Sequence, residues 1–331
     1  MTSYAIISPD MLQIGDQFDR YQIQAHLAKG GMSDIYRAFD LVNKREVALK
    51  VPDPGMIGDP AQYERFQREL EVMKTLSHPA ILHGLGSGKY NRMPYLVTEF
   101  VHGQSLRELI ETRAPLPIDQ AIDITLKIAD GMAHCHDNGV IHRDLKPENI
   151  FITANGQPVI MDFGLALTKS AHRVTYSNLS ATMGTPDYMA PEQVEGKRGD
   201  ARTDVYALGT ILYEMLAGKT PFTGDNNLAV MATHLNGTAP RLDRVQSNVT
   251  PQVAAIVARS LQRNPDARYQ DMRAFVDALN HPETADLAIL DQAPATKANQ
   301  FWHSQAVQAI GISVLVMVVI VAVALVLQAI R

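Results

Sequence analysis

The sequence predicts a two-lobed α+β fold followed by a membrane-spanning helix, and three patterns along its 331 residues support this. Alternating apolar residues dominate the first hundred residues and indicate a small β-rich lobe. Helical periodicity dominates residues 102–280 and indicates a larger helical lobe. The interval 306–330 carries no charged side chain and is long enough to cross a bilayer.

The smaller lobe is expected at residues 21–101, after an N-terminal extension of residues 1–20. In its first strand, alternate apolar residues share one face: Tyr21, Ile23, Ala25 and Leu27. Further strands are expected near 34–39, 46–51, 81–86 and 95–100. One long helix is expected between the third and fourth strands, because apolar residues there are spaced three or four apart: Tyr63, Phe66, Leu70 and Met73.

The larger lobe is expected at residues 102–280 and reads as mostly helical. A first helix has an apolar stripe along one face: Ile118, Ile122, Thr125, Ala129 and Met132. The interval 204–216 is apolar almost all round, which predicts a fully buried helix. Further helices are expected at 253–261 and 272–279. Prolines, alanines and threonines then predict a juxtamembrane linker at 281–305.

The C-terminal interval 306–330 is interpreted as a transmembrane helix. Its centre, 310–327, consists mostly of Val, Ile, Leu and Ala, and about 20 such residues span a bilayer. Phe301 and Trp302 precede it, where interfacial aromatic residues would lie. The alternative, a buried core helix, would need a domain packed around it.

Composition narrows the class of protein. The formal net charge is -5, which argues against a nucleic-acid-binding protein. Cys135 is the single cysteine, so an intrachain disulfide is excluded and a reducing compartment is expected. It lies between His134 and His136, but consecutive helical residues point in different directions, which favours a buried helix end over a metal site.

The residues best suited to chemistry lie between Val140 and Ile152, with Asp162-Phe163-Gly164 downstream. Phosphoryl transfer requires an oriented hydroxyl, metal-held phosphates and positive charge near the transferred group. Asp144 is suited to accept or orient a hydroxyl proton, and Lys146 to lie near the phosphoryl group. Asn149 and Asp162 offer oxygen ligands to Mg²⁺.

This arrangement resembles the Hanks-type (eukaryotic-like) serine/threonine protein kinase family, in its bacterial membrane-anchored type. The resemblance covers residues 21–279 and rests on His142-Arg143-Asp144, Asn149 and Asp162-Phe163-Gly164 in the family's order. It implies the two-lobed protein kinase fold, with ATP and Mg²⁺ (or Mn²⁺) as cofactors. Lys146 followed by Pro147 is the form found in enzymes that act on serine and threonine.

The resemblance also implies an ATP site in the smaller lobe. Ala48 leaves room for adenine, Lys50 reaches the α- and β-phosphates, and Glu69 pairs with Lys50. The backbone of Glu99 and Val101 would bind the adenine edge, with Thr98 behind it. The glycine-rich loop departs from G-x-G-x-x-G, because Ala28 and Ser33 replace its outer glycines. The expected loop residues are Leu27, Ala28, Lys29, Gly30, Gly31, Met32, Ser33 and Ile35.

The same resemblance gives structural roles to five further residues. Thr185 would face the catalytic loop, Glu192 would pair with Arg268, and Asp204 would hold the catalytic-loop backbone. Arg143 would bind a phosphate placed on the activation loop. The candidates for that autophosphorylation are Thr175, Ser177, Ser180 and Thr182. The alternative is a polar loop without regulatory phosphorylation.

The function expected is ATP-dependent transfer of phosphate to Ser/Thr hydroxyls of proteins. The expected location is the inner plasma membrane, single-pass, with the catalytic lobes in the cytoplasm and the C-terminus outward. The expected partners are protein substrates and the membrane, without nucleic acid, and a homodimer is left open. Two alternatives stand beside this hypothesis: a catalytically inactive scaffold of the same fold, and a small-molecule kinase.

Overall fold

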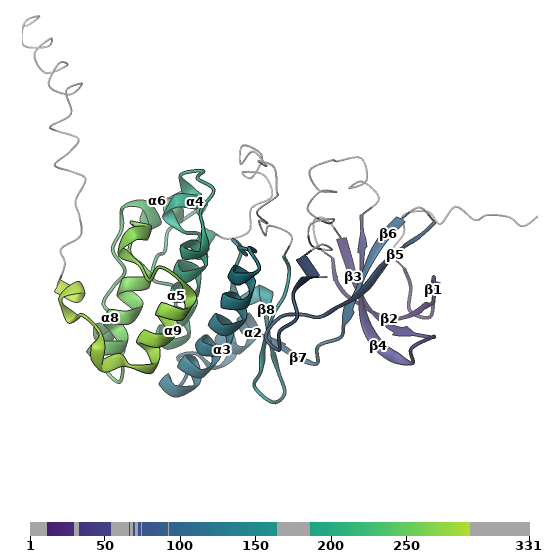
Figure 1. Ribbon diagram of the computed structural model, residues 1–331, viewed down its shortest axis with the longest axis horizontal. Coiled ribbons are helices and arrows are strands. Elements are labelled where there is room, and N and C mark those ends of the chain that lie inside the picture. The colour runs from purple at the N-terminus through teal and green to yellow at the C-terminus, as the bar shows by residue number, and fades with distance from the viewer. Residues whose placement is uncertain are drawn as a thin grey trace, which may run out of the picture.

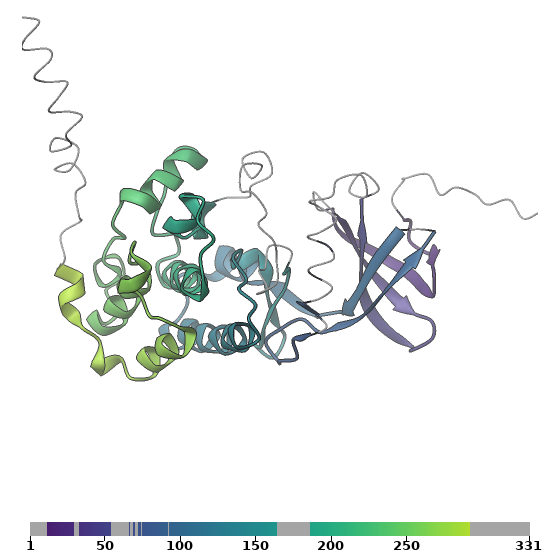
Figure 2. The ribbon, with the colours of Figure 1, turned by 45° about the horizontal axis from the view of Figure 1, so that its top comes forward.

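The structure is a computed structural model that describes residues 12–29, 33–53, 66, 69, 72–73, 75–91, 93–163 and 186–291. Two lobes lie side by side, a β-rich lobe in purple and blue and a helical lobe in teal and green (Figures 1 and 2). The predicted two-lobed division is confirmed. A single chain segment after β6 connects the β-rich lobe to the helical lobe.

The smaller lobe is built on a six-stranded sheet in which every neighbouring pair is antiparallel. In spatial order its strands are β1 (Gln17–Phe18), β2 (Tyr21–Lys29), β3 (Ser33–Asp40), β4 (Arg45–Pro52), β6 (Met93–Glu99) and β5 (Gly84–Tyr90). The strand predicted at 81–86 lies a few residues later than expected. Ile81 instead forms an isolated bridge with Ile160 of the larger lobe and is buried there.

Apolar residues on one face of this sheet form the core of the smaller lobe. The cluster comprises Phe18, Tyr21, Ile23, Tyr36, Ala38, Val47, Leu49, Val51, Tyr95 and Val97. Their alternation along the strands is the period-two pattern that predicted the sheet. A second cluster packs helical residues Phe66 and Met73 against Leu82, Leu96 and Val159, and so joins the predicted helix to the sheet.

The larger lobe begins with a three-stranded sheet of β7 (Gly103–Ser105), β8 (Ile150–Thr153) and β9 (Pro158–Ile160). Its α-helices are α2 (Leu106–Arg113), α3 (Ile118–Asp137), α4 (Pro191–Val194), α5 (Ala201–Ala217), α6 (Asn227–Asn236), α7 (Leu242–Val245), α8 (Pro251–Ser260) and α9 (Met272–Asn280). Short 3-10 helices are η2 (Pro147–Asn149), η4 (Pro186–Tyr188), η5 (Pro265–Ala267), η6 (Pro282–Thr284) and η7 (Leu287–Asp291).

Helix α5 lies at the centre of this lobe, as its uniformly apolar sequence predicted. The Asp200 carboxylate caps its first turn by accepting from the N–H of Arg202, and Gly218 ends it with a φ of 72°. At Gly209 a β-carbon would lie 2.0 Å from the Ser260 hydroxyl oxygen, so glycine allows α5 and α8 to approach closely. Every residue from Thr203 to Ala217 is buried.

The interval expected as a linker starts with ordered structure. Helices η6 and η7 pack beside α8, and an ion pair of 2.9 Å joins Arg241 to Asp291. The helices within the described ranges, which end at Asp291, are all too short or too polar to cross a bilayer. The predicted transmembrane helix at 306–330 lies outside those ranges.

Candidate active site

The catalytic loop runs from Ile141 to Asn149, between α3 and β8, and brings three polar side chains together. Lys146 Nζ lies 2.8 Å from Asp144 Oδ2. Asn149 Nδ2 donates to the Asp144 carbonyl at 2.8 Å and to Asp144 Oδ2 at 3.1 Å. Asp144 is therefore held by a cation on one side and an amide on the other. Burial opposes the charge of Lys146, but Asp144 outweighs it and raises the pKa of Lys146.

Asp204 of α5 holds the backbone at the start of this loop. Its two carboxylate oxygens accept from the N–H of His142 at 2.9 Å and from the N–H of Arg143 at 2.8 Å. His136 Nε2 lies 2.8 Å from the same carboxylate. Burial opposes ionisation of Asp204, but His136 and the backbone donors outweigh it, so the pKa of Asp204 lies below its usual range.

These hydrogen bonds hold Arg143 in a left-handed backbone conformation with a φ of 68°. For a residue other than glycine this conformation costs about 1–3 kcal/mol. Asp204 supplies part of the compensation, since it binds the Arg143 N–H directly. The loop geometry immediately before Asp144 thus depends on a buried carboxylate from a distant helix.

Lys50 of β4 reaches across to the helical residue Glu69. Its Nζ lies 2.8 Å from Oε1 and 2.7 Å from Oε2 of Glu69, and 3.7 Å from Oδ1 of Asp162. Burial opposes the charge of Lys50, but these two carboxylates outweigh it and raise the pKa of Lys50. The ammonium is therefore positioned between the smaller lobe and the segment that carries Asp162.

Asp162 also has a left-handed backbone, with a φ of 59°, while its side chain is about half exposed. The next residue, Phe163, is buried and its ring lies 4.9 Å from that of His142. His142 Nε2 is 3.1 Å from the Met161 carbonyl. These contacts fix the segment around Asp162 against the catalytic loop.

Two residues predicted to line an adenine site, Ala48 and Thr98, lie opposite one another where β4 pairs with β6. Thr98 is buried, and its hydroxyl donates to the Glu99 carbonyl at 3.0 Å. The Glu99 N–H donates to the His83 carbonyl at 3.1 Å. Of the two backbone groups of Glu99, the carbonyl oxygen is therefore the one available to a ligand. Val101 is half-buried two residues further on.

The strands beside the glycine-rich loop are paired up to its edges. Ala28 lies opposite Ile35 and Lys29 opposite Asp34, and Ile35 is paired with Lys50 on its other side. Leu27, Ala28 and Lys29 are exposed, whereas Ser33 is buried. The tip of the loop, residues 30–32, lies outside the described ranges.

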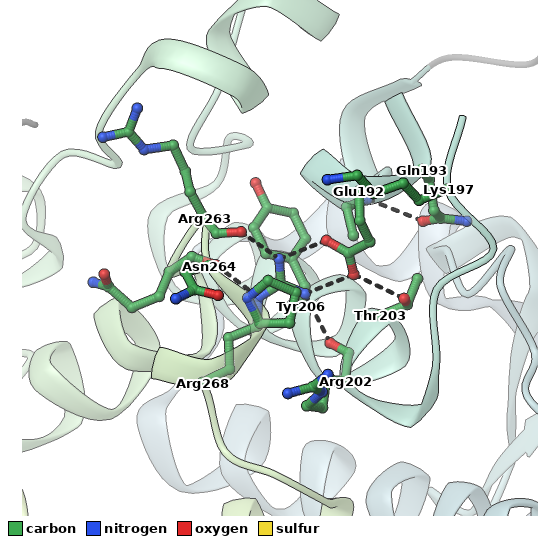
Figure 3. A network of polar contacts seen from close by, with 12 residues as sticks. Glu192, Gln193, Lys197, Arg202, Thr203, Tyr206, Arg263, Asn264 and Arg268 are labelled. Atoms are coloured by element: carbon green, nitrogen blue, oxygen red, sulfur yellow. Dashed lines mark hydrogen bonds and ion pairs between the residues drawn. The ribbon is translucent and has the colours of Figure 1, made fainter. Parts of the chain in front are cut away.

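Glu192 and Arg268 form a buried ion pair within the larger lobe (Figure 3). The two guanidinium NH groups lie 2.9 and 2.7 Å from Oε1 and Oε2 of Glu192. Arg268 also donates to the carbonyls of Arg202, Gln262 and Arg263. The pair anchors α4, at the end of the activation segment (residues 164–192), to the loop after α8.

The family model that matches this chain is "Protein kinase domain", over residues 21–282. The chain belongs to the protein kinase domain family. "Serine/threonine-protein kinase PknB" of Mycolicibacterium smegmatis is 38% identical over 275 residues, 81% of this chain and 44% of that protein. "Serine/threonine-protein kinase PknL" of Mycobacterium tuberculosis is 39% identical over 256 residues, 77% of this chain and 64% of that protein.

Solved structures agree with the family. The kinase domain of Mycobacterium tuberculosis PknI has a TM-score of 0.64 and 26% identity to this chain, and the match covers 82% of this chain and all of that one. The chain spans less than two thirds of the length of the PknB and PknL relatives that it matches.

The kinase family implies a divalent cation, and the donor set fits one. Asn149 is buried, and its Nδ2 is committed to Asp144, so its Oδ1 points the other way. Asp162 supplies a half-exposed carboxylate. The Met161 N–H donates to the Asn149 carbonyl at 2.8 Å, which links the two segments. Oxygen donors of this kind suit Mg²⁺ or Mn²⁺.

Several residues predicted for the kinase site lie outside the described ranges. These are Gly30, Gly31, Met32, Gly164, Thr175, Ser177, Ser180, Thr182 and Thr185. The structure brings together Lys50, Glu69 and Asp162 as one group, and Asp144, Lys146 and Asn149 as another. Among the described residues there is no cluster of three or more His, Cys, Asp or Glu side chains that could hold a metal ion, and Cys135 is buried in α3.

Two polar residues near the candidate active site were not singled out by the sequence. Gln193 of α4 donates to the Arg143 carbonyl at 2.8 Å. Arg107 of α2 contacts Glu148 of the catalytic loop at 2.9 Å and Glu214 of α5 at 2.8 Å. Neither contact has a signal in the local sequence, because the partners lie at least 41 residues apart.

Proposed function

We propose that this chain is an ATP-dependent serine/threonine protein kinase that transfers the γ-phosphoryl group of ATP to hydroxyl groups of proteins. One observation carries the proposal: the Asp144 carboxylate is held between Lys146 and Asn149. A carboxylate in this position can orient the acceptor hydroxyl and take its proton, while the nearby ammonium offsets negative charge on the transferred phosphate.

The Lys50–Glu69 ion pair supports activity rather than a scaffold role. Lys50 is positioned for the α- and β-phosphates only while Glu69 holds it, and both hydrogen bonds are formed. A bound divalent cation would neutralise phosphate charge, with Asn149 and Asp162 as its protein ligands. The groups that an inactive scaffold would lack are therefore present among the described residues.

A transfer assay separates the active kinase from its alternatives. The full chain is incubated with γ-labelled ATP, Mg²⁺ and a generic acceptor protein, beside an Asp144→Asn control. We expect label on the acceptor or on the chain itself, and its loss in the control. Absence of both in the unaltered chain would favour the scaffold, whereas label on small hydroxyl compounds alone would favour a small-molecule kinase.

The choice of serine and threonine rests on Lys146-Pro147 and on the relatives named as serine/threonine kinases. Hydrolysis of the labelled acceptor and separation of its phosphoamino acids test this choice directly. Phosphoserine and phosphothreonine are expected, and a product containing only phosphotyrosine would contradict it.

We also propose regulatory autophosphorylation of the activation loop. The candidates are Thr175, Ser177, Ser180 and Thr182, and Arg143 beside Asp144 is the proposed partner for the phosphate. A phosphate would add charge and three acceptor oxygens that order the segment. Phosphopeptide mapping after incubation with ATP tests this, and the absence of phosphate between residues 175 and 182 would contradict it.

The last proposal is that residues 306–330 anchor the kinase in the inner membrane, with the C-terminus outward. Support comes from the uncharged apolar composition of this interval. Cys135 is buried and burial raises the pKa of its thiol, so it provides a low labelling background. An Arg331→Cys variant should therefore be labelled by a membrane-impermeant maleimide on intact cells. Labelling only after lysis would indicate the opposite orientation, with the C-terminus inside the cell. Release of the chain from membranes by carbonate would contradict a membrane-spanning anchor.

A further inference from the structure

Two side chains from different helices hold the peptide groups on either side of Arg143. Asp204 of α5 accepts from the Arg143 N–H at 2.8 Å. Gln193 of α4 donates from Nε2 to the Arg143 carbonyl at 2.8 Å. Arg143 is left-handed, with a φ of 68°, and directly precedes Asp144. Hydrogen bonds to both the N–H and the carbonyl of Arg143 thus hold a backbone conformation that residues other than glycine rarely adopt.

The Arg143 carbonyl belongs to the same rigid peptide plane as the N–H of Asp144. On the other side of that plane the Asp144 N–H donates to His142 Nδ1 at 3.3 Å. When Gln193 fixes the carbonyl, it also fixes the bond from the nitrogen to the α-carbon of Asp144, because that bond lies in the same plane. The side chain that we propose as the proton acceptor is oriented from that backbone.

The other end of the Gln193 amide is also occupied. Its Oε1 accepts from the N–H of Ala190 at 3.0 Å, at the start of α4. Gln193 is 8% exposed, so water cannot readily replace either bond. Its neighbour Glu192 is anchored by Arg268 (Figure 3). Helix α4 therefore ties the end of the activation segment to the rest of the larger lobe through Glu192 and to the catalytic loop through Gln193.

We infer that Gln193 is a positioning residue that couples the docked end of the activation segment to the orientation of Asp144. This inference rests on the proposed kinase function. It makes the phosphoryl-transfer step depend on α4: when Ala190 and α4 are in place, the Gln193 amide is aimed at Arg143. Displacement of α4 withdraws that hydrogen bond without removing any group from the catalytic site.

A Gln193→Glu substitution separates the two ends of this bridge. Glutamate keeps an oxygen that accepts from the Ala190 N–H, but it places a second oxygen against the Arg143 carbonyl, which also only accepts. We expect kcat to fall about tenfold or more, with the KM for ATP little changed. If Gln193 serves only to cap α4, kcat of this variant will equal that of the unaltered chain, and the inference is overturned.

The pH profile adds a readout that a purely structural role would not change. A protonated glutamic acid regains a donor for the Arg143 carbonyl. The kcat of Gln193→Glu relative to the unaltered chain should therefore rise as the pH falls from about 8 to about 6, since burial raises a carboxyl pKa. A Gln193→Met control, which can neither donate nor titrate, should show a reduced ratio that is flat with pH. A flat ratio for both variants would contradict the inference.

Hydrogen exchange of the full chain tests the coupling without relying on activity. Peptides that cover residues 142–149 should exchange faster in both variants, while peptides of α3 and α9 stay unchanged. Unaltered exchange in the catalytic loop would overturn the inference even if the variants lose activity. A chain that transfers no phosphate before any substitution would instead overturn the proposed function, so the two failures are distinguishable.

Discussion

Lys50 donates from its Nζ to both carboxylate oxygens of Glu69, at 2.8 and 2.7 Å, and this pair links β4 to the helix of the smaller lobe. The Glu69 side chain is buried, with only 8% of its surface exposed. The ammonium also lies 3.7 Å from Asp162, on the segment that follows β9. Three separate pieces of the chain thus meet at one cation.

A Glu69→Gln substitution tests the importance of this pair for catalysis. The amide keeps the shape of the side chain but removes the charge that holds Lys50, so Lys50 is free to move toward Asp162. We expect kcat/KM to fall by about 10- to 100-fold, or about 1.4–2.7 kcal/mol in activation free energy. Steady-state kinetics measure this, with Glu111→Gln on the exposed face of α2 as a matched control. Equal losses in both variants would contradict a specific role.

Asp204 is expected to matter for both stability and activity. An Asp204→Asn substitution keeps the size but replaces one acceptor oxygen with a donor, which faces the N–H of His142 or Arg143. Loss of a buried charged acceptor destabilises a fold by about 3–5 kcal/mol. Urea unfolding of the variant should show a lower midpoint, and the surviving folded fraction should be slow in phosphoryl transfer. Normal kcat per folded molecule would mean that Asp204 serves stability alone.

The sequence predicted the parts of the fold that depend on local periodicity. Strands β2, β3 and β4 follow from alternation, and α5 from its continuous apolar run. The strand expected from Ile81 to Gly86 was misplaced. Ile81 is buried because it pairs with Ile160, a residue 79 positions further along the chain. Such a contact produces the same apolar signal as a strand without the strand's ladder of hydrogen bonds.

The candidate site shows the same division. Glu192 and Arg268 are in contact, as the family resemblance implied, although they lie 76 residues apart. The sequence did not predict a role for Gln193, because a glutamine in a short helix matches no catalytic or binding motif. Its importance arises only when the fold brings it to Arg143, which depends on the packing of α4 against the catalytic loop. Motifs therefore indicated the groups that we propose to react, while the residues that orient them could be recognised only from their contacts in the folded chain.

The Glu192–Arg268 pair predicts a marked difference between single and double substitutions. Arg268 is fully buried, so Glu192→Gln leaves an uncompensated charge and should cost about 3–5 kcal/mol of unfolding free energy. The double variant Glu192→Gln, Arg268→Met removes both charges and should cost less than the sum of the single substitutions. Urea unfolding of the four proteins gives the coupling. Additive losses would show that the two groups do not stabilise one another.

The pair also predicts acid sensitivity. Burial opposes ionisation of Glu192, but Arg268 outweighs it and lowers the pKa of Glu192 below its usual value near 4.5. A carboxyl with a lowered folded-state pKa contributes stability that is present above the unfolded-state value and is lost as the pH falls through the folded-state value. Below about pH 4.5 the unaltered chain should therefore lose unfolding free energy more steeply than the double variant. Parallel curves would contradict this.

His234 of α6 sets a second pH dependence in a more accessible range. It is fully buried, its Nδ1 lies 2.7 Å from the Tyr206 hydroxyl, and burial lowers its pKa to about 4 from a usual value of 6.5. The imidazole of His234 is therefore protonated below about pH 6.5 in the unfolded chain, but only below about pH 4 in the folded chain. The stability that His234 contributes is complete above pH 6.5 and is lost as the pH falls between these two values.

The expected loss across that window is on the order of 3 kcal/mol, because each pKa unit corresponds to about 1.4 kcal/mol. Asparagine at 234 can keep a bond to Tyr206 but cannot titrate, so the His234→Asn variant should lose less unfolding free energy between pH 7 and pH 5 than the unaltered chain. Urea unfolding at the two pH values measures this slope. Asn236, which is exposed on the same helix and has no titratable group, provides a matched control: Asn236→Ala should leave the slope unchanged. If His234→Asn also leaves it unchanged, the buried imidazole is not the group that makes the larger lobe sensitive to mild acid.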